Sequence, residues 1–472
     1  MNNEKLDTNQ KALQINLDAK KYGTFAEIGA GQEVARWFFH VGGAAGTVAK
    51  TISAYDMATS DAIYGPCARY VSRQRLESML DYEFNLVVER LNATRGSKCT
   101  FFSLADTVAT RSFTRQEDGH GWLGVRFQTE CQGVASEIIV HVRLLDKEPS
   151  REQEAVGIIG VNLMHGAFYL YQKPELLIGA LLDGLTRDRI EVDMIRFSGP
   201  AFNGLDNRLM SLQLVQQGLT DATMFTADGE VVQPAEALYK KAVLVERGSF
   251  RPVINTTLDM LERGLEQMLE DPGMKGEEPV VLMEMTLKNL LGESGIDHKD
   301  FLARVDLLRA LGKLVMISNF GRYYRLSSYL ARYTHKRTGI VLGIPSLKEI
   351  FDEKFYTDLE GGLLESLGKL LRNEVRLYVY PWLDPTTNLV VTAENLEVAP
   401  HLKHLYAHLL DNQCIVPISR HNVEYLSIFS RDVLTRIQSG NPSWEGMVPP
   451  AIVDIIKKNR FFGYQDQGCE QI

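Results

Sequence analysis

The pattern of apolar and polar residues predicts a mixed N-terminal region. Residues 101–108, 121–128 and 137–145 are predicted strands, the last because apolar and polar residues alternate along it. Residues 73–91 carry apolar side chains at helical spacing, which predicts an amphipathic helix, and residues 32–40 predict a shorter one. The first part of the chain is therefore expected to combine helices with strands in an α+β arrangement.

From about residue 155 onward, short apolar runs alternate with helical patterns. The expected strands are 156–164, 190–197, 222–225, 242–245, 280–285, 313–317, 339–343, 376–381 and 414–418, and the helices between them are 174–185, 208–218, 257–269, 300–311, 324–333, 362–371 and 400–410. Apolar strands that alternate with helices predict a parallel sheet covered on both faces. The expected fold class is α/β: a mixed α+β N-terminal region followed by one or two doubly wound, Rossmann-like units.

The length of 472 residues exceeds that of one ordinary core, so several domains are expected. Residues 1–20 are polar and predict a flexible arm. The boundaries that follow from the pattern are 21–150 for the mixed region, 151–270 for a first α/β unit, 271–440 for a second unit and 441–472 for a C-terminal tail. The break near 270 is a charged, glycine-containing stretch, and the tail is rich in proline and ends in a short predicted helix.

Composition narrows the class of protein. The net charge of −9, without a concentrated basic surface, argues against nucleic-acid binding. Five scattered cysteines, with no Cys-x-x-Cys pair, argue against a disulfide framework and against a cysteine zinc site. The first twenty residues lack the apolar core of a signal peptide, and no run approaches the ~18 apolar residues of a membrane helix. We therefore expect a cytoplasmic, bacterial-type protein with no membrane partner.

The strongest candidate for chemistry is a glycine turn that follows the predicted strand 242–245. The turn contains Gly248, Ser249, Phe250 and Arg251, and an amphipathic helix pattern begins soon after it. This segment resembles the opening signature of the nicotinate and nicotinamide mononucleotide adenylyltransferases. The resemblance implies that a nucleotide binds at the turn, where backbone N–H groups at a helix start can meet phosphate oxygens.

The resemblance to these transferases is partial. The family places two catalytic histidines after the glycine turn, where this chain has Ile254 and Thr257. A later family segment is matched approximately by Ser318 and Arg322, one residue short of the family spacing. If the resemblance extends to activity, it implies nucleotidyl transfer to a pyridine mononucleotide, with ATP and Mg as cofactors.

A bacterial family of about this length, which carries the nicotinic acid mononucleotide adenylyltransferase label, is also similar to this chain. The similarity runs through residues 22–57, 69–80 and 215–253. It therefore covers much of the first 255 residues and includes the glycine turn, but it does not restore the missing histidines.

Two other classes of protein remain open, a phosphohydrolase and a dinucleotide-binding fold. Asp228 follows the predicted strand 222–225 in a segment that faintly resembles the first loop of haloacid-dehalogenase phosphohydrolases, but Thr226 stands where the nucleophilic aspartate belongs and cannot form an acyl-phosphate. A carboxylate at a strand end can also hold ribose hydroxyls in dinucleotide-binding folds, although the Gly-x-Gly-x-x-Gly pattern is missing. Asp228 is therefore counted among the candidate nucleotide-binding residues.

Three other segments of the sequence can each be interpreted either structurally or functionally. The glycine-rich segment 42–51 has the wrong spacing for a phosphate loop and predicts close helix packing or a subunit contact. The histidines His401, His404 and His408 predict a solvated helix face, and we expect no metal site. The basic, aromatic segment 322–337 fits a phosphorylated ligand or a partner surface. The rival to a nucleotide-binding protein is thus a non-catalytic, homo-oligomeric α/β protein that lacks the catalytic histidines.

Overall fold

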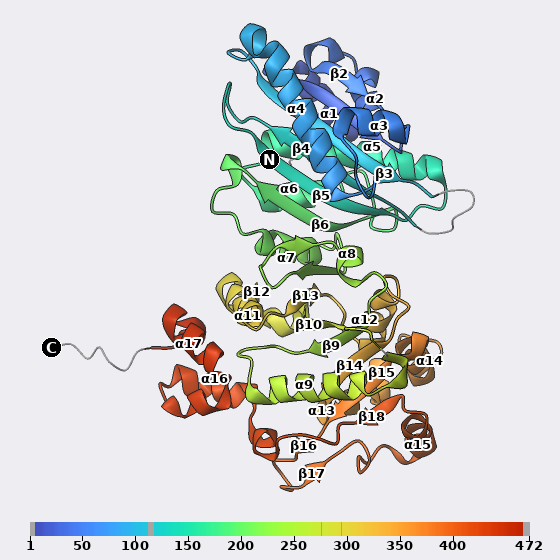
Figure 1. The fold of residues 1–472 in the computed structure, drawn as a ribbon, viewed down its shortest axis with the longest axis vertical. Helices are drawn as coiled ribbons and strands as arrows, with labels where there is room; N and C mark the ends of the chain where they lie inside the picture. Colours follow the sequence, from blue (N-terminus) through green and yellow to red (C-terminus); the bar gives the residue numbers. More distant parts are fainter. Residues whose placement is uncertain (1–4, 112–117, 275, 294, 466–472) are drawn as a thin grey trace, which may run out of the picture. The chain divides into compact units, whose positions relative to one another are not determined.

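The computed structural model describes residues 5–111, 118–274, 276–293 and 295–465 (Figure 1). The chain divides into two compact units, Met1–Thr223 and Met224–Ile472, called here the N-terminal and the C-terminal unit. None of the helices in these described residues has the length and apolar character that a membrane-crossing segment needs.

The N-terminal unit is built on a six-stranded sheet with the order β2-β1-β3-β4-β5-β6. The pairs β1–β2 and β1–β3 are parallel, and the pairs from β3 to β6 are antiparallel. The expected strands 101–108, 121–128, 137–145 and 190–197 are confirmed. The elements are α1 Thr8–Leu17, β1 Lys21–Ile28, α2 Glu33–His40, η1 Ala44–Gly46, β2 Val48–Ile52, α3 Met57–Tyr64, α4 Arg73–Arg95, β3 Thr100–Ala109, β4 Gly119–Phe127, β5 Ser136–Leu144, α5 Pro149–Tyr169, α6 Pro174–Ala180, β6 Ile190–Ser198, η2 Pro200–Phe202 and α7 Asn207–Gln216.

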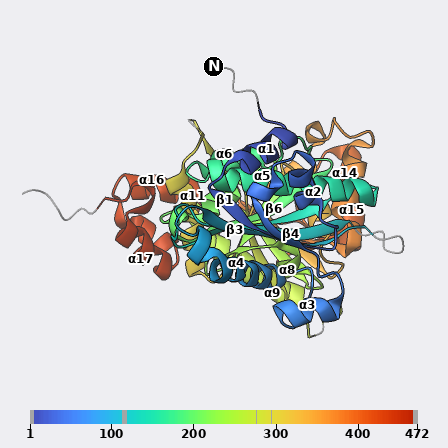
Figure 2. The same ribbon diagram turned by 90° about the horizontal axis from the view of Figure 1, so that it is seen from above.

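Helices cover both faces of this sheet (Figure 2). The long helix α4 lies on one face, where Leu76 and Leu80 stand so close to Gly124 of β4 that a Cβ there would meet their methyl groups. Helix α5 lies on the other face, and its Gly157 and Gly160 allow close contact with α2. The main core of the unit fills this second side with residues from Ala12 to Leu219, nearly all of them fully buried.

The expected strand 156–164 is wrong, because these residues form the middle of helix α5. The run is apolar and rich in valine and isoleucine, which is typical of a buried strand, but a short apolar run cannot be distinguished from a buried helix by its pattern alone. All residues from Ala155 to Phe168 are buried, so the helix needs no polar face. Conversely, β1 lies in a glycine-containing segment that was not expected to be a strand.

The expected flexible arm is also corrected over residues 8–17, which form helix α1. Asp7 and Gln10 make a capping box at its start, and Lys11, Ala12, Ile15 and Asn16 are buried. The side chain of Asn16 donates to the carbonyl of Gly42 at 2.7 Å, so the glycine-rich segment packs against α1. This contact accords with the helix-packing interpretation of residues 42–51. Residues 1–4 of the arm lie outside the described residues.

The C-terminal unit contains an eight-stranded sheet with the order β18-β15-β14-β9-β10-β13-β7-β8. The strands from β18 to β13 pair in parallel, and β8 forms an antiparallel hairpin with β7, the strand in which the division of the chain falls. The strands are β7 Ala222–Phe225, β8 Val231–Val232, β9 Val243–Arg247, β10 Val280–Thr286, β13 Leu314–Ser318, β14 Thr338–Gly343, β15 Arg376–Tyr380 and β18 Ile415–Pro417, with the short pairs β11 Leu291–Gly292, β12 Gly295–Ile296, β16 Trp382–Leu383 and β17 Val390–Val391.

The helices of this unit lie between the strands and after the last of them. They are α8 Pro234–Leu238, α9 Asn255–Leu269, η3 Pro272–Met274, α10 Leu287–Leu290, α11 His298–Ala310, α12 Tyr323–Leu330, α13 Ile344–Ile350, η4 Glu353–Phe355, α14 Gly362–Leu370, η5 Arg372–Glu374, η6 Pro400–Leu402, α15 Lys403–Asp411, η7 Val423–Ser427, α16 Ser430–Gln438, η8 Pro442–Met447, α17 Pro450–Asn459 and η9 Phe461–Gly463. The expected short helix of the proline-containing tail is confirmed as α17.

The order of the strands confirms the α/β fold class with one doubly wound unit. From β9 the chain runs to β10 and β13 on one side, returns to β14 on the other side of β9, and continues to β15 and β18. The direction of winding therefore reverses between β9 and β14. The expected division at residue 270 falls inside this sheet, because β9 before it and β10 after it are hydrogen-bonded neighbours.

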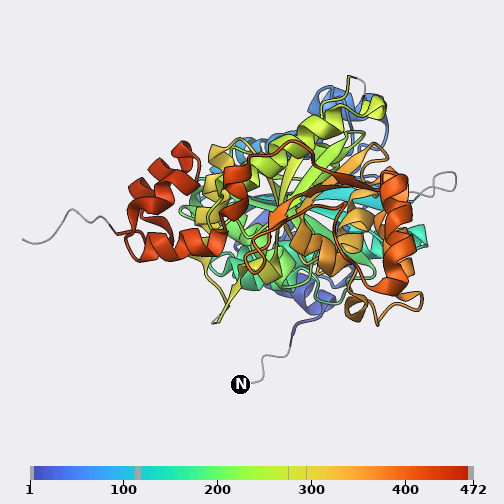
Figure 3. The same ribbon diagram turned by 90° about the horizontal axis from the view of Figure 1, so that it is seen from below.

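The two faces of this sheet are covered by different helices (Figure 3). Helix α9 lies on one face, where its Gly264 approaches Val341 of β14 and its Met268 approaches Gly339. Because successive side chains of a strand point to opposite faces, Arg247 of β9 and its neighbour Glu246 lie on opposite faces of the sheet. Arg247 instead meets Tyr323, the first residue of α12, on the second face.

Candidate functional site

Three neighbouring strands of the C-terminal unit bring polar groups together near their carboxyl ends. Arg247 is the last residue of β9, and it lies opposite Glu284 of β10 in the strand register. Ser318 is the last residue of β13. Together with Tyr323 at the start of α12, these residues form what we call the Arg247 cluster.

Glu284 is the centre of the cluster and is completely buried. Its carboxylate accepts two bonds from Arg247, from Nε at 2.7 Å to Oε2 and from Nη2 at 2.8 Å to Oε1. The hydroxyl of Ser318, also completely buried, donates to Oε1 at 2.6 Å. A paired arginine and carboxylate of this geometry is rigid and directional, and the serine bond helps to satisfy the buried charge.

Tyr323 covers the guanidinium group of Arg247. The guanidinium carbon lies 4.5 Å from the centre of the tyrosine ring, a distance at which a cation and an aromatic face attract each other. Burial works against the charge of Arg247, but the charge and hydrogen bonds of Glu284 outweigh it and raise the pKa of Arg247. Burial also raises the pKa of the Tyr323 hydroxyl, so this group stays neutral. About 10% of the Arg247 side chain is exposed.

Arg247, at the end of β9, borders the place where the winding of the sheet reverses, between β9 and β14, whereas Glu284 and Ser318 lie on the side of β9 away from β14. In open α/β sheets, ligands bind outside the carboxyl ends of the strands at such a reversal. The two bonds to Glu284 use Nε and Nη2 of Arg247, so the Nη1 edge of the guanidinium takes no part in that ion pair. The arrangement can therefore present a fixed, planar cation at the position where this fold binds its ligands.

The predicted glycine turn adjoins the cluster through Gly248. The N–H of Gly248 donates to the backbone carbonyl of Glu284 at 3.0 Å. Phe250 is buried, has a positive φ of 48°, and places its ring so close to Gly248 that a Cβ there would lie 2.7 Å from it. Glycine is therefore required at position 248 by the phenylalanine ring.

The rest of the turn is tied to neighbouring protein groups. Arg304 donates to the carbonyl of Ser249 at 3.2 Å, and the guanidinium of Arg251 binds the carboxylate of Asp300 at 2.6 Å. The hydroxyl of Ser430 donates to the carbonyl of Arg251 at 2.9 Å. Ser249, Phe250 and Arg251 thus stabilise a rigid loop beside the cluster.

The start of α9, where the resemblance places a phosphate site, is in contact with the C-terminal segment. Thr256 donates to the carbonyl of Tyr425 at 2.7 Å, and the side chain of Asn255 donates to the carbonyl of Gly446 at 3.1 Å. Ile254 occupies the N-cap position and makes no side-chain cap. These contacts place protein groups where the family pattern would place histidines and phosphate.

Two further candidate residues, Arg322 and Asp228, lie outside the Arg247 cluster. Arg322 stands next to Tyr323 but stacks on the ring of Phe355 at 4.1 Å, away from Arg247. Asp228 is exposed in the β7–β8 hairpin, and its carbonyl accepts a bond from Arg309 at 3.0 Å. Arg309 belongs to the end of α11 that leads into the start of β13. The structure therefore brings Gly248 and Ser318 to the cluster and places Asp228 away from it.

Sequence reasoning missed Arg247 and Glu284, whereas Tyr323 belongs to the basic, aromatic segment 322–337 that was a candidate for a phosphorylated ligand. Glu284 lies in a predicted strand and Arg247 just after one, but neither belongs to the motif that drew attention to the glycine turn. The available signal was a charged residue inside or at the end of an apolar parallel strand, as in the runs that contain Arg247 and Glu284. Burying such a charge costs free energy unless a partner compensates it, so a charged residue in an apolar strand points to a nearby partner or to a neutral form.

The cluster does not fit a resident magnesium ion. Mg²⁺ is usually bound through one or two carboxylates and the phosphates of its substrate. Here the single carboxylate, Glu284, already accepts bonds at both oxygens. Across the described residues, no group of three or more histidine, cysteine, aspartate or glutamate side chains is placed to hold a metal ion.

Comparison with known proteins finds few similarities. No protein-family model and no curated protein matches the chain. Among solved structures, a competence/damage-inducible protein from Agrobacterium tumefaciens matches at 15% identity with a TM-score of 0.25, covering 35% of this chain and 97% of that one. A CinA superfamily protein from Enterobacter cloacae matches at 13% identity with a TM-score of 0.26, covering 35% of this chain and 95% of that one. At these TM-scores neither likeness carries an argument about function.

Proposed function

We propose that the C-terminal unit binds a phosphorylated small molecule of the nucleotide class, with Arg247 as the anchor for its phosphate. The observation that supports this proposal is the buried Arg247–Glu284–Ser318 network, in which Arg247 on β9 borders the reversal of a doubly wound sheet. Buried charged groups at that position are typical of ligand sites in this fold.

The chemistry of the cluster favours a phosphate as the bound group. A guanidinium is planar and permanently charged, and it donates paired hydrogen bonds that match phosphate oxygens. Glu284 fixes its orientation, and Tyr323 supports its face, so little side-chain entropy is lost when a ligand binds. The nucleotide part of the proposal rests on the sequence resemblance of the glycine turn next to Arg247.

Binding is proposed without adenylyl transfer. Such a transfer needs groups that stabilise the charge developing on the phosphates, and the family supplies two histidines for this purpose. Ile254 is buried here, and the neighbouring start of α9 is held by Tyr425 and Gly446. Incubation with ATP, magnesium and nicotinamide mononucleotide should therefore release no pyrophosphate above a protein-free control.

A thermal-shift panel with ATP, AMP, nicotinamide mononucleotide and inorganic phosphate tests the binding proposal. A ligand at 100 times its Kd stabilises the folded state by about 2.7 kcal/mol, which is easily measured as a rise in melting temperature. At least one nucleotide should raise the melting temperature of the wild-type protein. The same nucleotide should have a smaller effect on Arg247→Lys, which keeps the charge but loses the planar fork.

Arg263→Lys is the matched control, because Arg263 lies on α9 and also forms ion pairs, with Asp259 and Glu266. It should respond to the nucleotide as the wild type does. A panel in which no phosphorylated compound shifts the melting temperature would contradict the proposal. In that case the non-catalytic, homo-oligomeric alternative, which light scattering can test, would become the better account.

A further inference from the structure

Two carboxylic acids lie side by side in the interior of the N-terminal unit. Glu27 of β1 and Asp106 of β3 are partners in the register of these parallel strands. Register partners point to the same face of a sheet, so the two carboxyl groups share one environment. Glu27 is fully buried, and Asp106 is 1% exposed. Two like charges at such a place are strongly unfavourable, so one of the two groups retains a proton.

Glu27 holds the first turn of helix α2. Its Oε2 accepts a bond from the backbone N–H of Val34 at 2.8 Å, and its Oε1 accepts one from the N–H of Ala35 at 2.9 Å. Gln32, the N-cap residue of this helix, makes no side-chain bond of its own there. Glu27 therefore caps α2 from the preceding strand, and the start of the helix favours its negative charge.

Asp106 has no comparable support. Among the described residues, no hydrogen bond of ordinary length and angle reaches either of its oxygens. Burial raises the pKa of Asp106 well above its usual range, the charge of Glu27 raises it further, and the backbone N–H of Ile28 opposes both. Asp106 is therefore the group that keeps the proton, with the carboxylate of Glu27 beside it.

Glu27 ionises at a lower pH than Asp106. Burial raises the pKa of Glu27 to about 7, the α2 N–H groups and Asp106 oppose this rise, and the charge of Glu33 adds to it. Above pH 7 the pair therefore carries one negative charge, on Glu27, and one proton, on Asp106.

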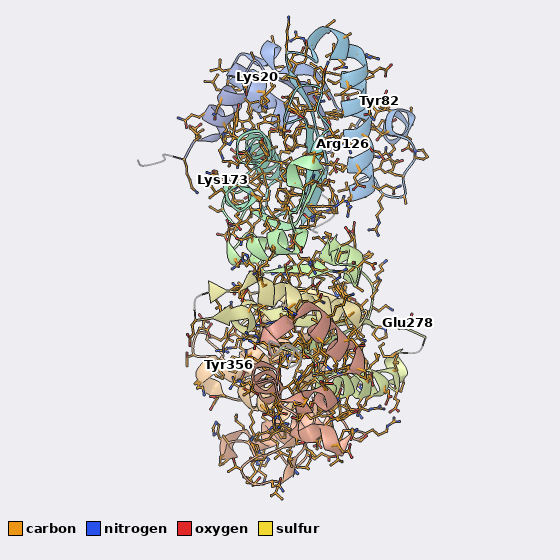
Figure 4. All side chains as sticks on the ribbon, turned by 90° about the vertical axis from the view of Figure 1, so that its left-hand side faces the viewer. Lys20, Tyr82, Arg126, Lys173, Glu278 and Tyr356 are labelled. Carbon is orange, nitrogen blue, oxygen red and sulfur yellow. The ribbon has the colours of Figure 1, made fainter. Side chains whose placement is uncertain are left out.

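The charged residues of the surrounding elements are engaged elsewhere. They pair as Glu33 with Arg36 in α2, Lys11 of α1 with Asp183, Lys50 of β2 with Glu83 of α4, and Arg126 of β4 with Asp81 of α4. Glu152 of α5 accepts from the backbone N–H of Arg111. The pairs of Lys50 and Arg126 lie on the opposite face of the sheet, which α4 covers, and Figure 4 labels Arg126 there. Within the described residues, no positive charge is paired with Glu27 or Asp106.

Glycines flank α2 on both sides. Gly31 before the helix and Gly42 after it have positive φ values of 91° and 80°, which glycine adopts readily. Conformational changes are usually absorbed at a few such positions. Helix α2 has only eight residues, so it is the element beside the pair that can move as a unit.

We propose that the Glu27–Asp106 pair is a pH-sensitive switch that controls the opening of α2. While Asp106 keeps its proton, Glu27 binds the start of the helix and the pair has a single charge. Loss of that proton leaves two adjacent anions in the interior. The opening of α2 lets water reach both carboxylates and relieves the repulsion. Opening therefore releases a proton, and alkaline pH favours it.

Hydrogen exchange of the α2 amides in the full-length protein measures this opening, after correction for the pH dependence of the intrinsic exchange rate. Above pH 7, the opening equilibrium of α2 should rise by up to about tenfold per pH unit, as expected for the release of one proton. The amides of α4, on the other face of the sheet, should not follow this rise. This comparison needs no variant, and an equal rise for α2 and α4 would overturn the proposal.

Asp106→Asn is the variant that isolates the switch, because asparagine keeps the shape and an N–H donor but never ionises. Its α2 opening should not depend on pH above 7. Asp81→Asn is the matched control, because the Asp81 side chain belongs to the same unit and is 57% exposed. This control should behave as the wild type does. An Asp106→Asn variant whose α2 amides keep the wild-type pH dependence would contradict the assignment of the switch to this pair.

Infrared spectroscopy tests the proton on Asp106 directly. At pH 8, the spectrum of the wild type minus that of Asp106→Asn should contain the C=O stretch of a protonated carboxyl group, which a carboxylate lacks. The absence of this band would show that Asp106 is ionised while α2 is closed, and the proposal would then be wrong.

Discussion

Two buried glutamates in adjacent strands of the C-terminal sheet have opposite energetic roles. Glu284 is paired with Arg247 and Ser318, so its charge is compensated. Glu246 is 2% exposed, and its Oε2 has no hydrogen-bond partner. Burial raises the pKa of Glu246 well above its usual range, and only the charge of Lys313 opposes this. The first carboxylate is stabilising as an ion, and the second costs free energy whenever it ionises.

Glu284→Gln should destabilise the protein by about 3–5 kcal/mol, because it leaves the buried charge of Arg247 without its partner. Chemical denaturation monitored by circular dichroism measures the change. A loss below 1 kcal/mol would show that the ion pair is not needed to hold Arg247, and the description of the cluster would then be wrong.

Glu246→Gln should stabilise the protein at pH 8 and leave it unchanged at pH 4. The folded-state pKa of Glu246 is raised, so wild-type stability falls as the pH rises above 4.5, the usual value for glutamate. Glutamine does not titrate and escapes this loss. The measurement is denaturation of both proteins across this pH range, and a gain that does not depend on pH would contradict the assignment.

At the scale of elements, the close contact between α9 and β14 depends on glycine at position 264, which has no side chain. A Cβ on Gly264 would lie 2.6 Å from a methyl group of Val341. Gly368 in α14 is exposed and has open space at the same position. The two glycines are therefore a matched pair, since both lie within helices but only one is needed for packing.

Gly264→Ala should destabilise the protein by about 1–3 kcal/mol, because the extra methyl group forces the helix away from the sheet. Gly368→Ala should stabilise it by about 0.5–1 kcal/mol, because alanine loses less backbone entropy in a helix. Melting temperatures of both variants give the comparison. If both substitutions stabilised the protein, α9 would not pack on β14 as described.

The sequence predicted most elements of the C-terminal unit, because its strands are continuous apolar runs separated by amphipathic helices. It could not predict which strands are neighbours, since the return from β13 to β14 depends on packing over long sequence distances. The same limit applies to the site. Gly248 and Ser318 were found from motifs, but Arg247 and Glu284 become a pair only through the register of β9 and β10. In the N-terminal unit, the pattern of residues 156–164 predicts a strand because this part of helix α5 has no polar face.

At the scale of the whole molecule, the N-terminal unit has its own hydrophobic core. The members of that core run from Ala12 to Leu219, all before the division of the chain. A fragment of residues 1–221 should therefore fold alone and unfold cooperatively in denaturant. Circular dichroism and dispersed amide NMR signals measure this, and a fragment without a cooperative transition would contradict the division into two units.

We propose that Arg247 anchors a phosphorylated ligand at the reversal of the C-terminal sheet. Isothermal titration calorimetry of wild type, Arg247→Lys and Arg263→Lys tests it most directly, with the nucleotide that gives the largest thermal shift. We expect Kd to rise at least about tenfold for Arg247→Lys, a loss of about 1.4 kcal/mol of binding free energy. Arg263→Lys should bind as the wild type does. Equal affinity of wild type and Arg247→Lys would contradict the account.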